Sequence, residues 1–208
     1  MDYKCTSPFE FTLPTKIVYG CGVLKQLPDE IRFFGGTKLL LLTDPGLVKA
    51  GIVSKVTNLL DAEGFAYEIF DGIEANPKDV NAEEGARAAR KIGADLLLAV
   101  GGGSPIDCAK AVGVLLAHDA EFIKPYEGKT AATLQGLPLI TVPTTSGTGS
   151  EITFSSVITD TKNHYKMTIK SPYTAAVCAV CDPELTLSVP ASVTAATGVD
   201  ALTHAIEG

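Results

Sequence analysis

The 208-residue chain contains no long apolar run and no block of basic residues. A bilayer crossing needs roughly 18 consecutive apolar residues, and no segment reaches that length. The first residues also lack the basic segment and following apolar run of a signal peptide. A net charge of −7 without a basic block disfavours nucleic acid and anionic membranes as partners. These absences predict a cytoplasmic protein that binds neither.

Cysteine is scarce, and the number of cysteines is odd. The five are Cys5, Cys21, Cys108, Cys178 and Cys181. The last two form a C-x-x-C pair, which could be redox-active or half of a zinc site. Their neighbours have the apolar character of a buried strand, and no second cysteine pair lies nearby in the sequence. We therefore expect core cysteines in a reducing compartment.

Hydrophobic residues, in contrast, make up 46% of the chain, enough for a buried core. Short, nearly continuous apolar runs alternate with segments in which apolar residues recur at helical spacing. The strand-like runs are 38–43, 66–70, 95–100, 137–142 and 176–181, and the helical segments are 46–63, 79–93 and 105–117. This alternation predicts an α/β fold, a Rossmann-like parallel sheet with helices on both faces.

Three segments depart from this alternation. Residues 9–18 look like one or two edge strands, and 153–160 with 165–170 resemble a hairpin that turns at 160–163. After Pro190 the pattern becomes helical. We expect one domain over 1–188 and the first helix of a truncated, all-helical domain over 189–208.

A glycine triplet follows the run at 95–100, in Gly101-Gly-Gly-Ser-Pro-Ile-Asp107. Glycine permits unusual dihedrals and a close approach of backbone to ligand. Ser104 suits the N-cap of a helix, Pro105 its first position and Asp107 its third. Free N–H groups at such a helix end favour a diphosphate. A tight turn without a ligand would also use these glycines.

Two further loops follow strand-like runs. Asp44 ends the run at 38–43, where an acid in dinucleotide-binding folds accepts hydrogen bonds from the adenosine ribose and repels a 2′-phosphate. An ordinary turn before Pro-Gly explains it equally well. The loop Pro143-Thr-Thr-Ser-Gly-Thr-Gly-Ser-Glu151 is rich in hydroxyls and small residues. That composition suits contact with a polar ligand, although a plain connecting loop could share it.

The last residues place Asp200 and His204 four positions apart. On a helix this spacing puts the carboxylate and the imidazole on one face, one turn apart. The pair can supply two ligands to one divalent metal, whereas a catalytic metal usually needs at least three from the protein. We therefore expect half of a metal site.

Taken together, the triplet motif, the hydroxyl-rich loop and Gly198-Val-Asp-Ala-Leu-Thr-His-Ala-Ile-Glu-Gly208 resemble the N-terminal portion of the iron-containing (group III) alcohol dehydrogenases. The motifs occur in order along essentially the whole chain. The resemblance implies a dinucleotide-binding domain over 1–188 and the start of a helical metal-binding domain over 189–208. It places the active site in the cleft between these two domains.

The resemblance also implies a role for each candidate residue. Asp44 would face the adenosine ribose and Asn76 would lie beside the cofactor. The diphosphate would be held by Gly102, Gly103 and Ser104, with Thr144, Thr145 and Thr148 along the phosphate and nicotinamide-ribose side. Lys166 would contact the nicotinamide ribose. Asp200 and His204 would be the first two of four metal ligands.

The function implied is reversible hydride transfer between a primary alcohol and NAD, with Fe²⁺ or alternatively Zn²⁺ as Lewis acid. The family takes two further histidine ligands from its helical domain, beyond position 208. We therefore expect an N-terminal fragment with little activity of its own, and a homo-oligomer in the complete protein. The alternative is a non-catalytic nucleotide-binding module that a partner chain completes.

Overall fold

The structure, a computed structural model, describes residues 10–207 and contains a six-stranded sheet in which every pairing is parallel. In spatial order its strands are β1 (Lys16–Tyr19), β8 (Cys178–Cys181), β5 (Leu139–Pro143), β4 (Leu96–Gly101), β2 (Lys38–Leu42) and β3 (Ala66–Phe70). The α/β prediction is confirmed, and each of the five predicted core strands is present.

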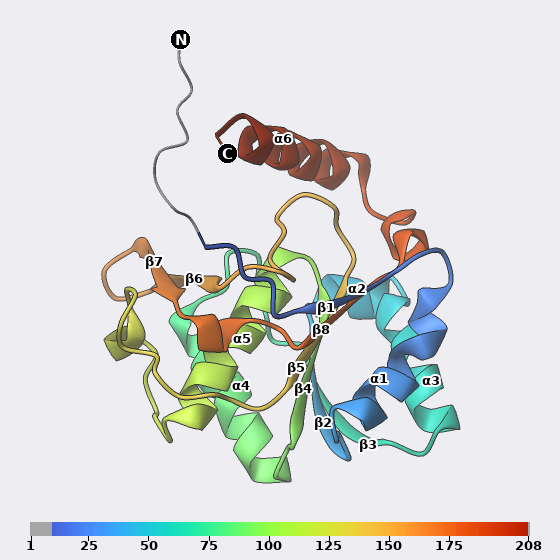
Figure 1. The fold of residues 1–208 in the computed structure, drawn as a ribbon, viewed down its shortest axis with the longest axis horizontal. Helices are drawn as coiled ribbons and strands as arrows, with labels where there is room; N and C mark the ends of the chain where they lie inside the picture. The colour runs from blue at the N-terminus through green and yellow to red at the C-terminus, as the bar shows by residue number, and fades with distance from the viewer. Residues whose placement is uncertain (1–9, 208) are drawn as a thin grey trace.

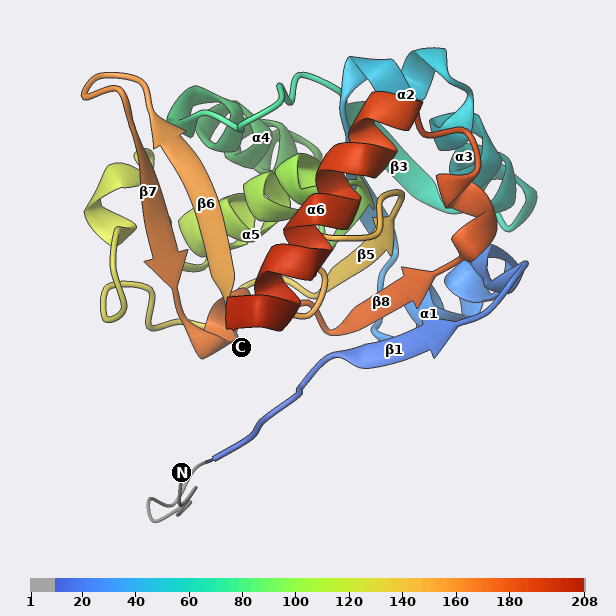
Figure 2. The ribbon, with the colours of Figure 1, turned by 90° about the horizontal axis from the view of Figure 1, so that it is seen from above.

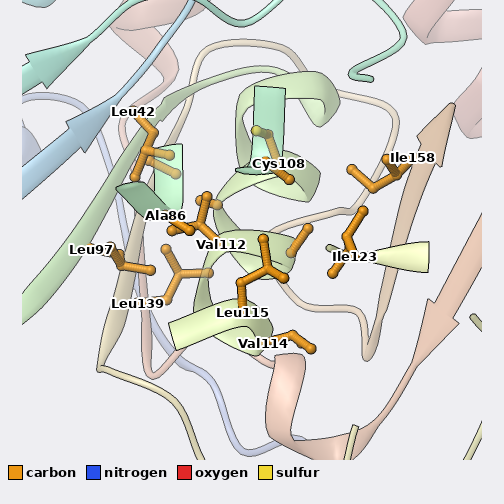
Figure 3. Packing of buried hydrophobic residues seen from close by; sticks show 14 of the residues in the cluster. Leu42, Ala86, Leu97, Cys108, Val112, Val114, Leu115, Ile123, Leu139 and Ile158 are labelled. Atoms are coloured by element: carbon orange, nitrogen blue, oxygen red, sulfur yellow. The ribbon is translucent and has the colours of Figure 1, made fainter. Parts of the chain in front are cut away.

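Both faces of this sheet are covered by helices, as Figure 1 shows. The helices are α1 (Leu27–Phe33), α2 (Pro45–Lys49), α3 (Ile52–Ala62), α4 (Asp79–Ile92), α5 (Gly103–Ala117) and α6 (Ala191–Glu207). Alternate residues of β2 and β4 divide between two apolar clusters, because successive strand side chains point to opposite faces. One cluster packs on α4 and α5 (Figure 3), and the other packs on α1 and α3.

The predicted helix over 46–63 is instead two helices, α2 and α3. Gly51 separates them with a φ of 75°, a left-handed conformation that glycine adopts without strain. Of the one or two edge strands predicted over 9–18, one forms, β1, which begins at Lys16 and ends one residue past the predicted range, at Tyr19; Phe9 lies outside the described residues.

A separate two-stranded sheet holds the predicted hairpin. Strands β6 (Ser155–Asp160) and β7 (Tyr165–Lys170) pair antiparallel, and Asp160 accepts hydrogen bonds from the backbone of Lys162 and Asn163 in the turn. Helix α6 crosses above the carboxyl edge of the large sheet (Figures 1 and 2). None of the helices in the described part of the chain is both long and apolar enough to cross a bilayer. The division of the chain at 188/189 stays a prediction.

The strand order fixes where a ligand can bind. Strand β2 lies between β3 and β4, and the chain passes from it first to β3 on one side and then to β4 on the other. The connections that leave β2 and β4 therefore run to opposite faces, and a crevice opens between the carboxyl ends of these two strands. Asp44 follows β2 and the glycine triplet follows β4. The topology thus brings two sequence-distant candidate sites together.

Candidate functional site

The glycine triplet forms the tight turn between β4 and α5. Gly101 has a φ of 154°, and a Cβ atom there would collide with the ring of Pro105. Helix α5 begins at Gly103 with Gly102 as its N-cap, and no side chain caps it. The predicted cap at Ser104, with Pro105 first and Asp107 third, is therefore wrong. Because glycine can take the cap conformation itself, the helix starts two residues earlier than the sequence predicts.

This helix start is open to a ligand. The first N–H groups of a helix have no partner within it, and Pro105 carries no N–H, so Gly103 and Ser104 present theirs at the positive end of the helix dipole. A Cβ atom on Gly102 would lie 3.0 Å from Oγ1 of Thr145, and one on Gly103 would lie 3.1 Å from Cγ2 of Thr148. Glycine thus keeps the space between turn and hydroxyl-rich loop clear, as a closely bound diphosphate requires.

Asp44 has the turn role that its sequence context allowed, because its carboxylate caps α2. Oδ1 accepts a hydrogen bond from the backbone N–H of Leu47 at 3.0 Å. The same residue lines a cavity of about 690 Å³ at the crevice between β2 and β4. The other candidate residues in its wall are Gly102, Gly103, Ser104, Thr144 and Thr145. The cap and a ligand contact are therefore compatible roles.

A second cavity, of about 440 Å³, adjoins the first at Gly103 and Ser104. The remaining candidate residues line it, namely Asn76, Thr148, Lys166, Asp200 and His204. The structure therefore gathers every candidate residue around two adjoining hollows that share the N-terminus of α5.

Asn76 and Lys166 lie near one another although 90 positions separate them. Asn76 adopts a left-handed φ of 55°, and its carbonyl oxygen accepts a hydrogen bond from Thr159 Oγ1 at 3.4 Å. Lys166 is the hairpin partner of Thr159 and is exposed. Lys170, the other lysine of this strand, lines a different hollow, beside Lys129 and Phe154.

Asp200 and His204 project from α6 into the second cavity, with Nε2 of His204 3.7 Å from Oδ1 of Asp200. The predicted one-turn spacing is therefore present. A carboxylate oxygen and an imidazole nitrogen suit iron(II) or zinc. Among residues 10–207, however, no three histidine, cysteine or acidic side chains cluster as a metal site would need. The residues present fit one half of a coordination sphere.

Asp107 is the residue whose placement the sequence did not indicate. Its side chain is nine-tenths buried and lines the second cavity. Oδ2 accepts a hydrogen bond from the Val157 N–H at 2.9 Å, whereas Oδ1 has no hydrogen-bond partner among the described residues. Burial raises the pKa of this carboxyl, and the nearby ammonium of Lys110 opposes the shift. An unpartnered buried oxygen is an available acceptor for a ligand.

The cysteine pair does not form a site. Cys178 is fully buried in β8, and Cys181 is partly buried three residues later in the same strand. An odd separation in a strand sends the two side chains to opposite faces. Burial raises the pKa of the Cys178 thiol to about 12 and that of Cys181 to about 11, which disfavours the reactive thiolate. The expected core role of Cys178 is confirmed.

A model of the family described as "Iron-containing alcohol dehydrogenase" matches residues 14–183. Choline dehydrogenase of Bacillus subtilis (strain 168) is 42% identical over 199 residues, which are 95% of this chain and 50% of that protein. Lactaldehyde reductase of Escherichia coli (strain K12) is 40% identical over 192 residues, 91% of this chain and 50% of that protein. The chain thus spans about half the length of these curated relatives.

Solved structures agree with this match. A crystal structure of 1,3-propanediol oxidoreductase has a TM-score of 0.91 and 38% identity, over 96% of this chain and 52% of that one. Sulfoacetaldehyde reductase from Bifidobacterium kashiwanohense, solved in complex with NAD⁺, has a TM-score of 0.88 and 33% identity, over 97% of this chain and 53% of that one. Both structures therefore share the fold of this chain over nearly its whole length, with sequence identities of 38% and 33%.

Proposed function

Because the chain belongs to the iron-containing alcohol dehydrogenase family, we propose that it is the cofactor-binding part of an NAD- and metal-dependent alcohol dehydrogenase. One observation carries the proposal. The candidate residues, which come from six separate stretches of sequence, all line two adjoining cavities around the N-terminus of α5. The substrate class we propose is a small alcohol or aldehyde, in keeping with the names of the relatives.

NAD would lie along the two cavities with its diphosphate at the N–H groups of Gly103 and Ser104. The adenosine ribose would face Asp44, whose carboxylate also disfavours the 2′-phosphate of NADP. The nicotinamide end would then extend into the second cavity. The residues that would orient that end are Asn76, Thr148 and Lys166, with Asp107 as a further acceptor.

When bound, NAD supplies the hydride acceptor, and iron(II) or zinc supplies the Lewis acid that stabilises an alkoxide. Asp200 and His204 would hold the metal from the α6 side of the second cavity. The nicotinamide end and the metal would thus share one hollow. This chain's own contribution is to bind both groups and to orient them toward a common substrate position.

We further propose that these 208 residues alone turn over little or no alcohol. The described residues bring together two metal ligands, whereas a catalytic metal usually has at least three from the protein. Moreover, α6 is largely exposed and has no fully buried residue. Helix α6 consequently does not shield that side of the second cavity from water.

Calorimetric titration of the chain with NAD and with NADP tests this proposal. We expect saturable binding of NAD and weaker binding of NADP. We also expect weak, sub-stoichiometric uptake of iron(II) or zinc. In the presence of NAD and either metal, we expect negligible oxidation of propanediol or butanol. Absence of NAD binding would contradict the cofactor assignment. Stoichiometric metal uptake with normal turnover would instead contradict the incompleteness of the metal site.

A further inference from the structure

Lys110 is a buried charged residue beside the proposed site. It lies on α5, one turn after Asp107, and only 2% of it is exposed. An isolated ammonium in such a place would be strongly unfavourable, so its partners must compensate for the lost water. This degree of burial is rare for lysine and calls for an explanation beyond packing.

The ammonium is surrounded by oxygen atoms from one short stretch of chain. Nζ donates to the carbonyl oxygens of Ser150, Thr153 and Ser155 at 2.6, 2.9 and 2.9 Å, and contacts Thr153 Oγ1 at 3.0 Å. An ammonium has three protons, so it is fully satisfied by these acceptors. Hydrogen bonds from a charged donor are the stronger ones in proteins.

This stretch has little other support. The chain between β5 and β6 contains no helix or strand, so its backbone carbonyls are not paired in a regular ladder. Two of its residues, Ser150 and Thr153, nevertheless line the second cavity, together with Ser155 at the start of β6. Just beyond it, Ser156 Oγ donates to the Asp107 carbonyl oxygen at 2.7 Å. Lys110 therefore supplies the central link between this wall and α5.

We infer that Lys110 is a positioning residue, which fixes the wall of the second cavity at residues 150–155 so that the nicotinamide end of the cofactor meets a preformed site. This inference rests on the proposed function. The adenosine end binds at the first cavity, to which residues 150–155 do not contribute. Loss of the ammonium should therefore weaken binding of one half of the cofactor selectively.

The test compares NAD with AMP, which keeps only the adenosine end, on the wild-type chain and on Lys110→Met. Methionine fills a similar volume but removes the charged donor that three carbonyl oxygens share, those of Ser150, Thr153 and Ser155. We expect NAD binding to weaken by about tenfold or more and AMP binding to change by less than about twofold, because pre-organisation is lost at one end only. Lys110→Gln, which retains two N–H donors, should restore part of the NAD affinity.

Ser171→Ala is the matched control, because Ser171 is also buried and donates to a carbonyl oxygen, that of Ala132 at 2.6 Å, away from both cavities. It should lower stability and leave the ratio of NAD to AMP affinity unchanged. Parallel losses for NAD and AMP in Lys110→Met, or no loss for either, would overturn the positioning role. So would failure of both Lys110 variants to fold, which would make Lys110 a core residue. If wild type binds no NAD, the proposed function itself fails.

Discussion

The carbonyl oxygen of Thr197 lies directly against the backbone of Gly147, so close that a Cβ atom on Gly147 would overlap it. Gly147 belongs to the hydroxyl-rich loop after β5, and Thr197 lies within α6, one turn before Asp200. Figure 2 shows α6 crossing above this loop. A glycine contact thus sets how closely the helix with the two proposed metal ligands approaches the two cavities.

Gly147→Ala should displace α6 without damaging the sheet. Gly147 does not have a left-handed φ, and the three atoms nearest to an added Cβ all belong to Thr197. We expect faster amide hydrogen exchange throughout α6 and unchanged exchange in β4 and β5. Gly198→Ala is the matched control, since nothing lies within 4 Å of its Cβ position, and it should stabilise the helix by about 0.5–1 kcal/mol. Equal exchange in the two variants would contradict the contact.

Helix α6 should also be the least protected helix of the unaltered chain. Apolar side chains such as Val199, Leu202 and Ile206 are 63%, 59% and 75% exposed, so little burial opposes its local opening. Amide exchange over 191–207 should therefore be faster than in the central strands. Equal protection of α6 and the sheet in a proven monomer would contradict this expectation. Protection that appears with self-association would instead identify these apolar side chains as a contact surface.

The space between the glycine turn and the hydroxyl-rich loop can be tested by adding single methyl groups. A Cβ on Gly102 or Gly103 would press on Thr145 or Thr148 and occupy the approach to the helix N–H groups. We expect Gly102→Ala and Gly103→Ala each to weaken NAD binding by about tenfold or more, because the diphosphate needs close backbone contact. Calorimetric titration measures this change.

Gly113→Ala provides the control in the same helix, because its Cβ would make an ordinary contact with Leu97 at 3.8 Å. It should leave NAD binding unchanged and raise the stability of the chain slightly. Loss of NAD affinity in this control as well would show that α5 itself, rather than the turn, is being perturbed.

The sheet was predictable because its signal is local. The interiors of the runs 38–43 and 95–100, residues 39–42 and 96–100, are apolar at every position, as is typical of a strand covered on both faces, and β2 and β4 form there. The break within 46–63 was not predicted, because apolar spacing continues across Gly51 although the backbone does not. Likewise, Ser104 had the composition of an N-cap, but Gly102 took the cap through its backbone conformation alone.

The sequence predicted the candidate residues that lie in recognisable motifs. It did not predict the residues whose environment depends on tertiary contacts. Asp107 and Lys110 lie in a helix whose sequence gives no sign that residues 40 or more positions later surround them. Their environment is set by β6 and the chain before it. The one signal in the sequence was a lysine among the apolar positions of this helix, because lysine is rarely buried. The sequence does not show which residues would contact it.

Asp44→Asn separates the observed capping role of this residue from its proposed role in cofactor binding. Asparagine keeps the oxygen that accepts from the Leu47 N–H and caps helices as well as aspartate, so stability should change by less than about 0.5 kcal/mol. The charge that repels a 2′-phosphate is lost, and the affinity for NADP relative to NAD should rise by about tenfold. Asp29→Asn on α1 makes the same change in net charge and should leave the ratio unchanged. An unaltered ratio in Asp44→Asn would leave Asp44 with its capping role alone.

Lys110 should give the stability of the chain a distinctive pH dependence. Burial lowers the pKa of its ammonium to about 8, with Asp107 and Glu151, the charged groups that face it, opposing the shift. An unfolded lysine titrates at about 10.4, so between these values the unfolded chain binds more protons than the folded chain. The free energy of unfolding contributed by Lys110 therefore rises with pH in this window, by about 3 kcal/mol at most.

Urea unfolding of wild type and Lys110→Met at pH 7 and pH 10 isolates this contribution, because all other titrating groups are common to both chains. The stability of wild type relative to the variant should increase between the two pH values. A difference that stays constant would mean that the ammonium keeps its ordinary pKa. In that case hydrogen bonds to the carbonyl oxygens of Ser150, Thr153 and Ser155 offset the whole free-energy cost of burying the ammonium. Lys110 would then bind the cavity wall more strongly than its lowered pKa indicates.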